Sequence, residues 1–240
     1  MTKFSNISLI NPDNTSSWES KKFLTFDFDW ANDYVLHDTI ELIEKACVPS
    51  TWFVTHETPL IDSLRKLKNV ELGIHPNFNP LLDGTCQNHN NTSEKILKSS
   101  MSLVKDAKSV RSHSLTQNER LVDQFKQLGL THISNTFIPC GSGNFVKPFK
   151  IWDQMVVVPH CWQDNVSLKM SLPFPTSIEI SPMFHVFNFH PIHVFLNTEN
   201  IDRYEHTRAI HNNPKELLKY RHNGVGTRTK LIDLLKIVSW

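Results

Sequence analysis

Four short apolar runs, each ending in a side chain that can bind a metal or move a proton, constrain the fold of this chain most strongly. They occupy residues 24–30, 70–76, 110–114 and 187–193. In the first run, Asp27 and Asp29 alternate with Phe26 and Phe28, so a strand would point both carboxylates to one face. Two like charges this close repel each other unless a metal, a cation or a shared proton compensates. The runs therefore predict a functional site at the tips of parallel strands.

Segments with strand and helix patterns alternate along the chain. We predict strands at residues 22–27, 50–55, 70–74 and 109–111, and later ones around 133, 155–159 and 185–189. We predict helices at residues 33–46, 59–68, 93–105, 118–128 and 230–238. Asn32 or Asp33 is the expected cap of the first helix, and Ser93 that of the third. This alternation favours an α/β barrel or a doubly wound sheet.

The chain of 240 residues shows no low-complexity linker, internal repeat or long charge run that would divide it. We therefore expect a single domain over residues 1–240, with an N-terminal arm or short hairpin at 1–20, a motif-bearing core at about 21–195 and a C-terminal helical segment at about 200–240. The 25 Lys and Arg nearly balance the 24 Asp and Glu, which argues against nucleic acid as a partner. The sequence leaves the oligomeric state open.

Nothing in the sequence predicts export or membrane insertion. The segment that starts at Met1 lacks the apolar core of a signal peptide, and no run is long enough to cross a bilayer. The four cysteines form no C-x-x-C pair, so we expect free thiols in a reducing compartment. They are Cys47, Cys86, Cys140 and Cys161. The expected location is the cytoplasm.

The first motif resembles one from a known enzyme family. Residues 25–29 (Thr-Phe-Asp-Phe-Asp) are similar to the Asp-x-Asp motif of the polysaccharide deacetylases with a NodB-homology domain, also called carbohydrate esterase family four. Residues 50–54 (Ser-Thr-Trp-Phe-Val) resemble the strand that follows in that family, and the resemblance is to its WbmS-like branch, associated with O-antigen synthesis. It implies a distorted (β/α) TIM-like barrel, with Asp27 as the catalytic base and Asp29 as a metal ligand.

The second and third motifs resemble the family with one exchange. Residues 75–79 match a His-x-x-x-His pair of metal ligands, but only His75 is kept and the second position holds Asn79. Residues 111–114 match Arg-x-Pro-Tyr, whose arginine orients the catalytic Asp. Here Arg111 would do so through a bidentate contact, and His113 is expected to replace the missing ligand. Asn79 remains the alternative third ligand, although an amide oxygen binds zinc weakly.

The last motif lies at residues 187–190, where the resemblance implies that His190 protonates the leaving group. His193 is the rival for that role. Residues 162–164 (Trp-Gln-Asp) give the weakest match, to a motif whose Asp tunes this histidine. Trp30 and Trp162 stand beside motif residues and are candidates for stacking on a sugar ring.

Three of these features also have plain structural explanations. Asp29 could cap the helix that follows it, as Asp often does after a strand. His113 lies among Ser and Thr residues that form a polar turn without any site. The pair Gly224 and Gly226 could bind an anion before the last helix, or serve only as its entry turn.

These residue types together predict a metal-dependent hydrolase. A divalent ion, zinc before others, would be held by Asp29, His75 and a third group, with Asp27 as the base and a histidine as the acid. The resemblance implies removal of an acetyl group, an N-acetyl rather than an O-acetyl, from a sugar or glycoconjugate precursor of a bacterial surface polysaccharide. The alternatives are an amidohydrolase acting on a non-sugar amide and a non-catalytic carbohydrate-binding relative.

Overall fold

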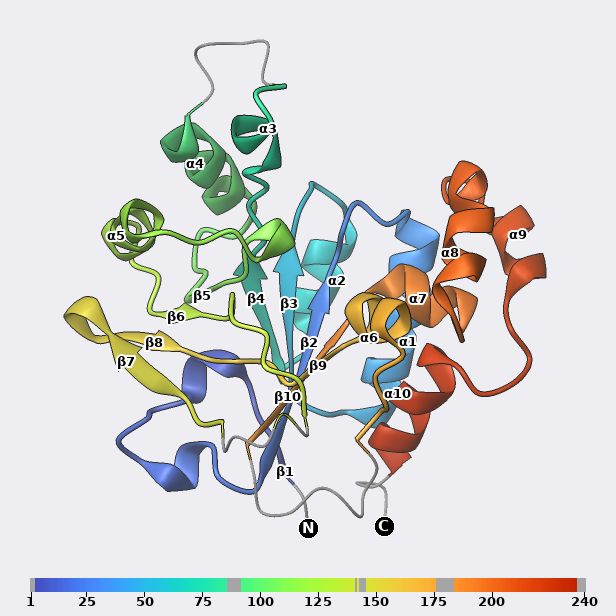
Figure 1. Cartoon of the computed structure of the whole chain (residues 1–240), viewed down its shortest axis with the longest axis horizontal. Helices are drawn as coiled ribbons and strands as arrows, with labels where there is room; N and C mark the ends of the chain where they lie inside the picture. Colours follow the sequence, from blue (N-terminus) through green and yellow to red (C-terminus); the bar gives the residue numbers. More distant parts are fainter. Residues whose placement is uncertain (1–2, 86–91, 141, 143–145, 176–183, 237–240) are drawn as a thin grey trace.

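The computed structural model describes residues 3–85, 92–140, 142, 146–175 and 184–236. Within these residues, ten strands form one curled sheet, with helices packed around it (Figure 1). The strands are β1 Lys3–Phe4, β2 Lys21–Asp27, β3 Ser50–Val54, β4 Val70–Ile74, β5 Ser109–Val110, β6 His132–Ile133, β7 Phe149–Ile151, β8 Met155–Val157, β9 Trp162–Gln163 and β10 His185–Phe189.

The sheet has the order β7-β8-β6-β5-β4-β3-β2-β10-β9, and β1 pairs with β2 beside this path. All pairings are parallel except β7 with β8, which is antiparallel. Among the described residues β7 and β9 end the sheet, which therefore curls into a half-barrel without closing. The predicted α/β class and distorted barrel are confirmed. The carboxyl ends of the parallel strands meet at one edge, where ligands bind in such folds.

The described helices are α1 Asp33–Ala46, α2 Leu60–Lys66, α3 Asn79–Leu82, α4 Ser93–Leu103, α5 Glu119–Gln127, α6 Asp164–Met170, α7 Pro191–Leu196, α8 Ile201–Thr207, α9 Pro214–Leu217 and α10 Thr227–Lys236. The five predicted helices are all present. The prediction of Ser93 as a cap was wrong, because the side chain of Thr92 accepts the N–H of Lys95 instead. The short helices α8 and α9 lie in the predicted C-terminal helical segment, whereas α3, α6 and α7 were not predicted, since runs of four to seven residues give little periodic signal.

Helix α1 shows why its end lies where it does. The side chain of Asn32 accepts the N–H of Tyr34 and caps the helix. Its buried face carries Val35, Leu36, Thr39, Ile40 and Ile43, at the spacing of one helical stripe. Because Asn32 is the cap, Asp29 three residues earlier is free for another role.

The core beneath the site is rich in aromatic rings. Phe26 of β2 stacks on Trp52 of β3 with ring centroids 4.2 Å apart, and on Phe189 of β10 at 5.9 Å. All three side chains are fully buried, and each such burial stabilises the fold by about 1.5–3 kcal/mol. Trp162 is buried in the same core, with its ring 4.9 Å from Phe189. The expectation that Trp162 stacks on a sugar was therefore wrong.

The N-terminal residues belong to the core and form no hairpin. Strand β1 runs parallel to β2, whereas a hairpin needs antiparallel strands. The backbone N–H of Ile7 donates to Thr51 Oγ1 over 3.1 Å, and the side chains of Ile7 and Trp18 are buried against Phe23. The N-terminal arm is thus held by strand pairing with β2, a hydrogen bond to β3 and burial of its apolar side chains.

The C-terminal segment returns to α1. Asp38 of α1 forms ion pairs with Arg221 and Arg228. A Cβ at Gly226 would lie 2.0 Å from the carbonyl oxygen of Asn197, so only glycine fits there. The N–H of Gly226 donates to Thr229 Oγ1. This pairing supports the entry-turn interpretation of the two glycines over an anion site.

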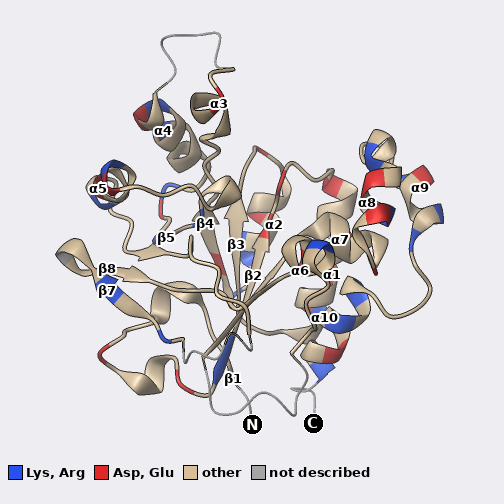
Figure 2. Cartoon of the chain, in the orientation of Figure 1, with Lys and Arg blue, Asp and Glu red and all other residues tan. Residues whose placement is uncertain are grey.

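Surface charge and thiols follow the composition. Basic and acidic residues are interspersed along α4, α5, α8 and α10 (Figure 2). Among the described residues, Cys47, Cys140 and Cys161 form no disulfide, and Cys86 lies outside them. None of the described helices combines the length and hydropathy needed to span a bilayer.

Candidate active site

Asp27, the last residue of β2, is held by a hydrogen bond to each of its two carboxylate oxygens. Its Oδ1 accepts Arg111 Nη1 at 3.0 Å and its Oδ2 accepts Asn188 Nδ2 at 2.7 Å. The side chain is almost fully buried. Burial alone would raise the pKa of Asp27, but the charges of Arg111, His75 and His190 lower it. Asp27 is therefore an ionised carboxylate with a fixed orientation.

Arg111, which follows β5, is the cation that compensates this charge. Its guanidinium is fully buried and lies 4.5 Å from the ring of Phe53. Nη1 also donates to Thr25 Oγ1 at 2.8 Å, and Nη2 donates to Ser134 Oγ at 2.8 Å. The predicted bidentate contact is wrong in detail, because one nitrogen reaches Asp27 and the second serves Ser134. The amide of Asn188 takes the other carboxylate oxygen instead.

Asp29 lies two residues beyond the end of β2, on strained backbone. Asp29 and Trp30 have φ values of 43° and 56°, in the left-handed region that non-glycine residues avoid. Two such residues in succession cost of order 1–3 kcal/mol each and are typical of functional sites. The N–H of Trp30 donates to Thr55 Oγ1 at 3.2 Å and helps to hold this turn.

Two histidines converge on one oxygen of Asp29. His75 Nε2 and His113 Nδ1 each lie 3.1 Å from Asp29 Oδ1. One ligand atom from each of the three side chains lies within 4.8 Å of the others. Tetrahedral zinc with bonds of about 2.0 Å would separate its ligand atoms by roughly 3.3 Å. The two separations from Asp29 Oδ1 are close to this value, and the limit of 4.8 Å for the whole set is compatible with such a centre.

The turn that carries His113 is tied to the loop that carries His75. The N–H of His113 donates to the carbonyl of Pro76 at 2.9 Å, and Asn135 Oδ1 accepts the N–H of Ser112 at 2.8 Å. Asn79 Nδ2 donates to Ser114 Oγ at 2.9 Å. Ser114 and Leu115 are left-handed as well, with φ of 56°. Asn79 thus contacts the turn of His113, while His113 itself lies against Asp29.

His190 follows β10 and is oriented by Asp164, which follows β9. Asp164 Oδ1 accepts His190 Nδ1 at 2.5 Å, and Oδ2 accepts the backbone N–H of His190 at 2.7 Å. His190 Nε2 lies 3.3 Å from Asp29 Oδ2 and 3.6 Å from Asp27 Oδ2. Burial would lower the pKa of His190, but the charge and hydrogen bond of Asp164 raise it well above its usual value. This upward shift of the pKa favours the protonated form of His190, which lies between the two carboxylates.

The other carboxylate and histidine have different environments. Burial would raise the pKa of Asp29, but hydrogen bonds from His113, His190 and His75 hold it well below its usual value. His193 is buried, and its Nδ1 lies 3.2 Å from Thr198 Oγ1. Burial lowers the pKa of His193 to about 4, so this ring is neutral.

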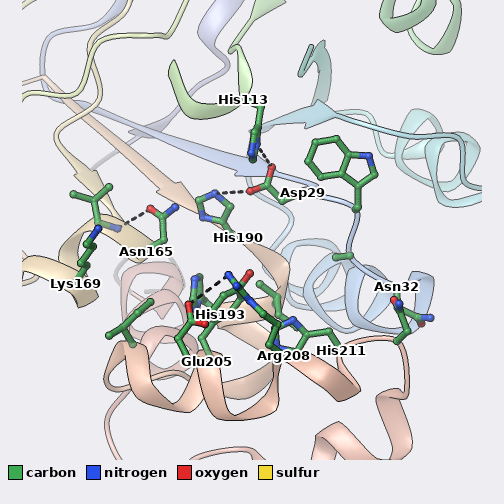
Figure 3. Close-up of a pocket in the computed structure, with 17 residues that line it drawn as sticks. Asp29, Asn32, His113, Asn165, Lys169, His190, His193, Glu205, Arg208 and His211 are labelled. Atoms are coloured by element: carbon green, nitrogen blue, oxygen red, sulfur yellow. Dashed lines mark hydrogen bonds and ion pairs between the residues drawn. The ribbon is translucent and has the colours of Figure 1, made fainter. Parts of the chain in front are cut away.

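A cavity of about 690 Å³ opens beside these groups. Asp29, His113 and His190 lie together at one part of its wall, the α6 residues Asn165 and Lys169 lie beside His190, and His193 lies with residues of α8 below them (Figure 3). Trp30 also faces the cavity; it is 46 % exposed, and its ring centroid lies 5.1 Å from that of His113. The volume of the cavity is typical of small-molecule sites. The exposed ring of Trp30 lies where a bound ligand could contact it.

Sequence reasoning missed several residues that hold the site. Asn188, Thr25 and Ser134 complete the shell of Asp27 and Arg111, and Asn135 secures the turn before His113. The detectable signal was a polar residue inside an apolar run, such as Asn188 between two phenylalanines of β10. Its polar atoms had to find partners in the interior, because buried polar groups are nearly always paired.

Comparison with known proteins identifies the family. The sequence profile of the WbmS-like polysaccharide deacetylases matches residues 24–208, which include every motif above. The chain belongs to this family. No curated protein matches the sequence significantly.

One solved structure agrees with this assignment. WbmS of Bordetella bronchiseptica, assigned as a polysaccharide deacetylase involved in O-antigen biosynthesis, is 42% identical, each chain covers 98% of the other, and the TM-score is 0.93. A family 4 carbohydrate esterase from Bacillus anthracis is 17% identical over 97% of this chain and 87% of its own, with a TM-score of 0.43. This second similarity is too low to carry an argument about the site. The fold of the WbmS-like deacetylase family is the fold of this chain.

Proposed function

We propose that this chain is a metal-dependent deacetylase that removes an N-acetyl group from a sugar or glycoconjugate precursor of a bacterial surface polysaccharide. The observation that carries the proposal is the meeting of Asp29, His75 and His113 beside the ionised Asp27 and the protonated His190. A carboxylate base and an imidazolium acid on two sides of a cation site are the parts that amide hydrolysis needs.

The donor set fits a divalent cation, with zinc favoured. One carboxylate and two imidazoles are typical ligands of catalytic zinc. The exchange within the motifs also supports His113 as the third ligand, because Asn79 donates its amide N–H₂ to Ser114 and lies behind the turn of His113. A cation held there would polarise the acetyl carbonyl and lower the pKa of a water molecule.

Two residues of the chain transfer the protons, one as the general base and one as the general acid. Asp27 takes the proton of the attacking water, and the guanidinium of Arg111 keeps it ionised and immobile between turnovers. His190 gives its proton to the departing amine, with Asp164 fixing its ring and its charge. His193 is neutral and one helical turn further on, so it is better suited to contact the substrate than to act as the acid.

Family membership supports a saccharide as the substrate, and the relative from Bordetella, assigned to O-antigen biosynthesis, supports a surface polysaccharide as the destination. The exposed ring of Trp30 at the cavity is suited to the face of a sugar. An N-acetyl group is favoured over an O-acetyl group because a protonated His190 is most useful when the leaving group is a poor one, such as an amine. A cytoplasmic location is part of the proposal.

The first test measures metal content and acetate release together. Wild type, His75→Ala, His113→Ala and Asn79→Ala are analysed for bound metal, titrated with zinc, and assayed for acetate released from N-acetylated and O-acetylated saccharides. We expect near-stoichiometric metal in wild type and Asn79→Ala, and loss of metal in both histidine variants, because each removes one of three ligands.

Other outcomes would change the assignment. Loss of metal in Asn79→Ala, with retention in His113→Ala, would return the third ligand to Asn79. Metal binding without acetate release, but with hydrolysis of simple non-sugar amides, would favour the amidohydrolase alternative. A wild-type chain that binds saccharide but no specific metal would contradict the hydrolase and leave a carbohydrate-binding relative.

A further inference from the structure

A line of hydrogen bonds runs from the interior to the wall of the cavity, and none of the proposed catalytic steps uses it. Its members are His160, Gln163 and Asn165, on and beside β9 and the start of α6. His160 Nε2 lies 2.7 Å from Gln163 Oε1, and Gln163 Nε2 lies 2.7 Å from Asn165 Oδ1. Asn165 lines the cavity, whereas His160 is fully buried.

One backbone donor, which cannot act as an acceptor, fixes which group donates and which accepts along this line of hydrogen bonds. The backbone N–H of Val166 donates to Asn165 Oδ1 at 2.6 Å. Reversing the side-chain amide would place its N–H₂ against this backbone donor, so the oxygen must stay on that side. Gln163 must then donate to the same oxygen, and its own Oε1 must accept from His160.

The environment of His160 agrees with this direction. Burial and the charge of Arg111 lower the pKa of His160 to about 3, so the ring is neutral and carries one N–H. With the proton on Nε2 it is donated to Gln163, and only a lone pair on Nδ1 is left without a partner among the described residues. The other tautomer would leave a buried N–H unpaired, which costs more than an unpaired acceptor.

The remaining polar group of Asn165 therefore has one defined role. Its Oδ1 is used twice, and the described part of the chain offers Nδ2 no hydrogen-bond partner. In Figure 3 the amide nitrogen of Asn165 points away from Lys169 and toward His190, across the cavity wall. The wall presents a donor, and not an acceptor, next to the proposed acid.

We propose that Asn165 is a specificity-determining residue whose Nδ2 donates a hydrogen bond to an oxygen acceptor of the saccharide, with Gln163 and His160 as positioning residues whose hydrogen bonds support the orientation set by the N–H of Val166. The inference rests on the proposed function, which brings a saccharide to this wall. A ligand offering a donor at this position would be rejected, because donor would face donor in a half-buried site.

The first test examines the line without any substrate. The ¹⁵N chemical shifts of His160, assigned with a His160→Gln variant, report which ring nitrogen carries the proton. We expect the neutral Nε2–H form throughout about pH 5–8, because both Gln163 and burial favour it. A neutral Nδ1–H ring, or a protonated ring at neutral pH, would overturn the fixed direction whatever reaction the protein performs.

The second test changes the cavity end, using the acetylated saccharide that wild type hydrolyses fastest. Asn165→Leu removes the donor and should raise KM about tenfold, the loss of one neutral hydrogen bond. Asn165→Asp puts an acceptor in its place and should raise KM further, and kcat should fall less than about threefold in both. Asn212→Leu is the matched control, since Asn212 lines the same cavity outside this line of bonds.

The third test changes the interior end. Gln163→Leu removes one of the two donors that hold Asn165 Oδ1 and leaves the N–H of Val166, so it should raise KM about threefold, with no change in the pH at which the rate falls. Equal KM values for Asn165→Asp and wild type would overturn the donor role. If Asn212→Leu raised KM as much as Asn165→Leu, the effect would belong to the cavity in general and the assignment would fail. A wild type without acetate release would contradict the proposed function alone, because the ¹⁵N result stands independently.

Discussion

Asp27 and Asp29 are two residues apart in one strand-and-turn segment, yet the protein treats their charges in opposite ways. Asp27 is buried and paired with Arg111, a cation that belongs to the chain and cannot leave. Asp29 is partly exposed on strained backbone, and the groups around it are the imidazoles of His75, His113 and His190. The charge of Asp27 is neutralised by a cation of the chain itself, Arg111, whereas Asp29 faces histidines that can also bind a metal.

The difference separates a fixed catalytic group from a binding group. A base must keep one orientation through the reaction, so its hydrogen bonds are better supplied by permanent neighbours such as Arg111 and Asn188. A metal ligand must turn a lone pair toward the ion, and the ring nitrogens of His75 and His113 that face Asp29 Oδ1 are placed to do so. The other nitrogen of His75, Nδ1, is buried with no hydrogen-bond partner among the described residues and lies 3.9 Å from Asp27 Oδ1.

The largest expected effect tests whether the two carboxylates have separate roles. Asp27→Asn keeps the shape of the side chain but removes the base, so acetate release should fall by at least about 10³-fold while bound metal is retained. Asp29→Asn should lose activity to a similar extent and metal as well. Elemental analysis beside an acetate assay decides this. Loss of metal in Asp27→Asn would show that both carboxylates bind the ion.

The next effect concerns stability in the absence of metal. Arg111→Met leaves Asp27 as a buried charge without its cation and should lower the free energy of unfolding by about 3–5 kcal/mol. His113→Ala should change it by less than about 1 kcal/mol, because the ring is partly exposed. Urea unfolding in the presence of a chelator measures both. A similar loss of unfolding free energy in the two variants would contradict the view that Asp27 is neutralised by a permanent structural cation and Asp29 by metal-binding side chains.

A third prediction uses the pH dependence of the reaction. Asp164 raises the pKa of His190, so the acid form persists to higher pH than an ordinary histidine allows. Asp164→Asn removes this charge and lowers that pKa, so the fall of kcat/KM on the alkaline side should begin at a lower pH. The acidic side should move little, because it reports Asp27. An unchanged alkaline limb would exclude His190 as the acid.

The smallest expected effect concerns Trp30. Its exposed ring touches the ring of His113 but provides no ligand atom. Trp30→Phe keeps an aromatic face and should raise KM less than about threefold, and Trp30→Ala should raise it about tenfold with bound metal unchanged. Saturation kinetics on one saccharide would show the split. A loss of metal in Trp30→Ala would instead make the ring a support of the Asp29 side.

The sequence predicted best those parts of the protein in which local pattern decides structure. Strands β2, β3, β4 and β10 are apolar runs with polar ends, and the helices predicted from periodicity are all present. The family and the half-barrel were also predicted correctly, because the motifs occur in the family's order. Asp29, His75 and His113, which come from three different strands, do lie together.

What the sequence did not predict depends on contacts between distant segments. Asn188 meets Asp27 across 161 residues, and Asn135 meets Ser112 across 23. The single-nitrogen contact of Arg111 depends on the space left by Ser134. The packing of Trp162 against Phe189 likewise could not be read from its place beside a motif. Local pattern identifies which residues end a strand, but not which neighbours they will have.

The left-handed backbone at Asp29, Trp30, Ser114 and Leu115 has a consequence for engineering the protein. Each position lowers the stability of the folded state by roughly 1–3 kcal/mol. Interactions elsewhere in the fold must offset this cost. Leu115 is the one of these four that neither lines the cavity nor offers a polar side chain. Leu115→Gly is therefore the place to gain thermal tolerance without touching the chemistry. The same exchange at Trp30 would gain stability at the expense of the ring that faces the substrate.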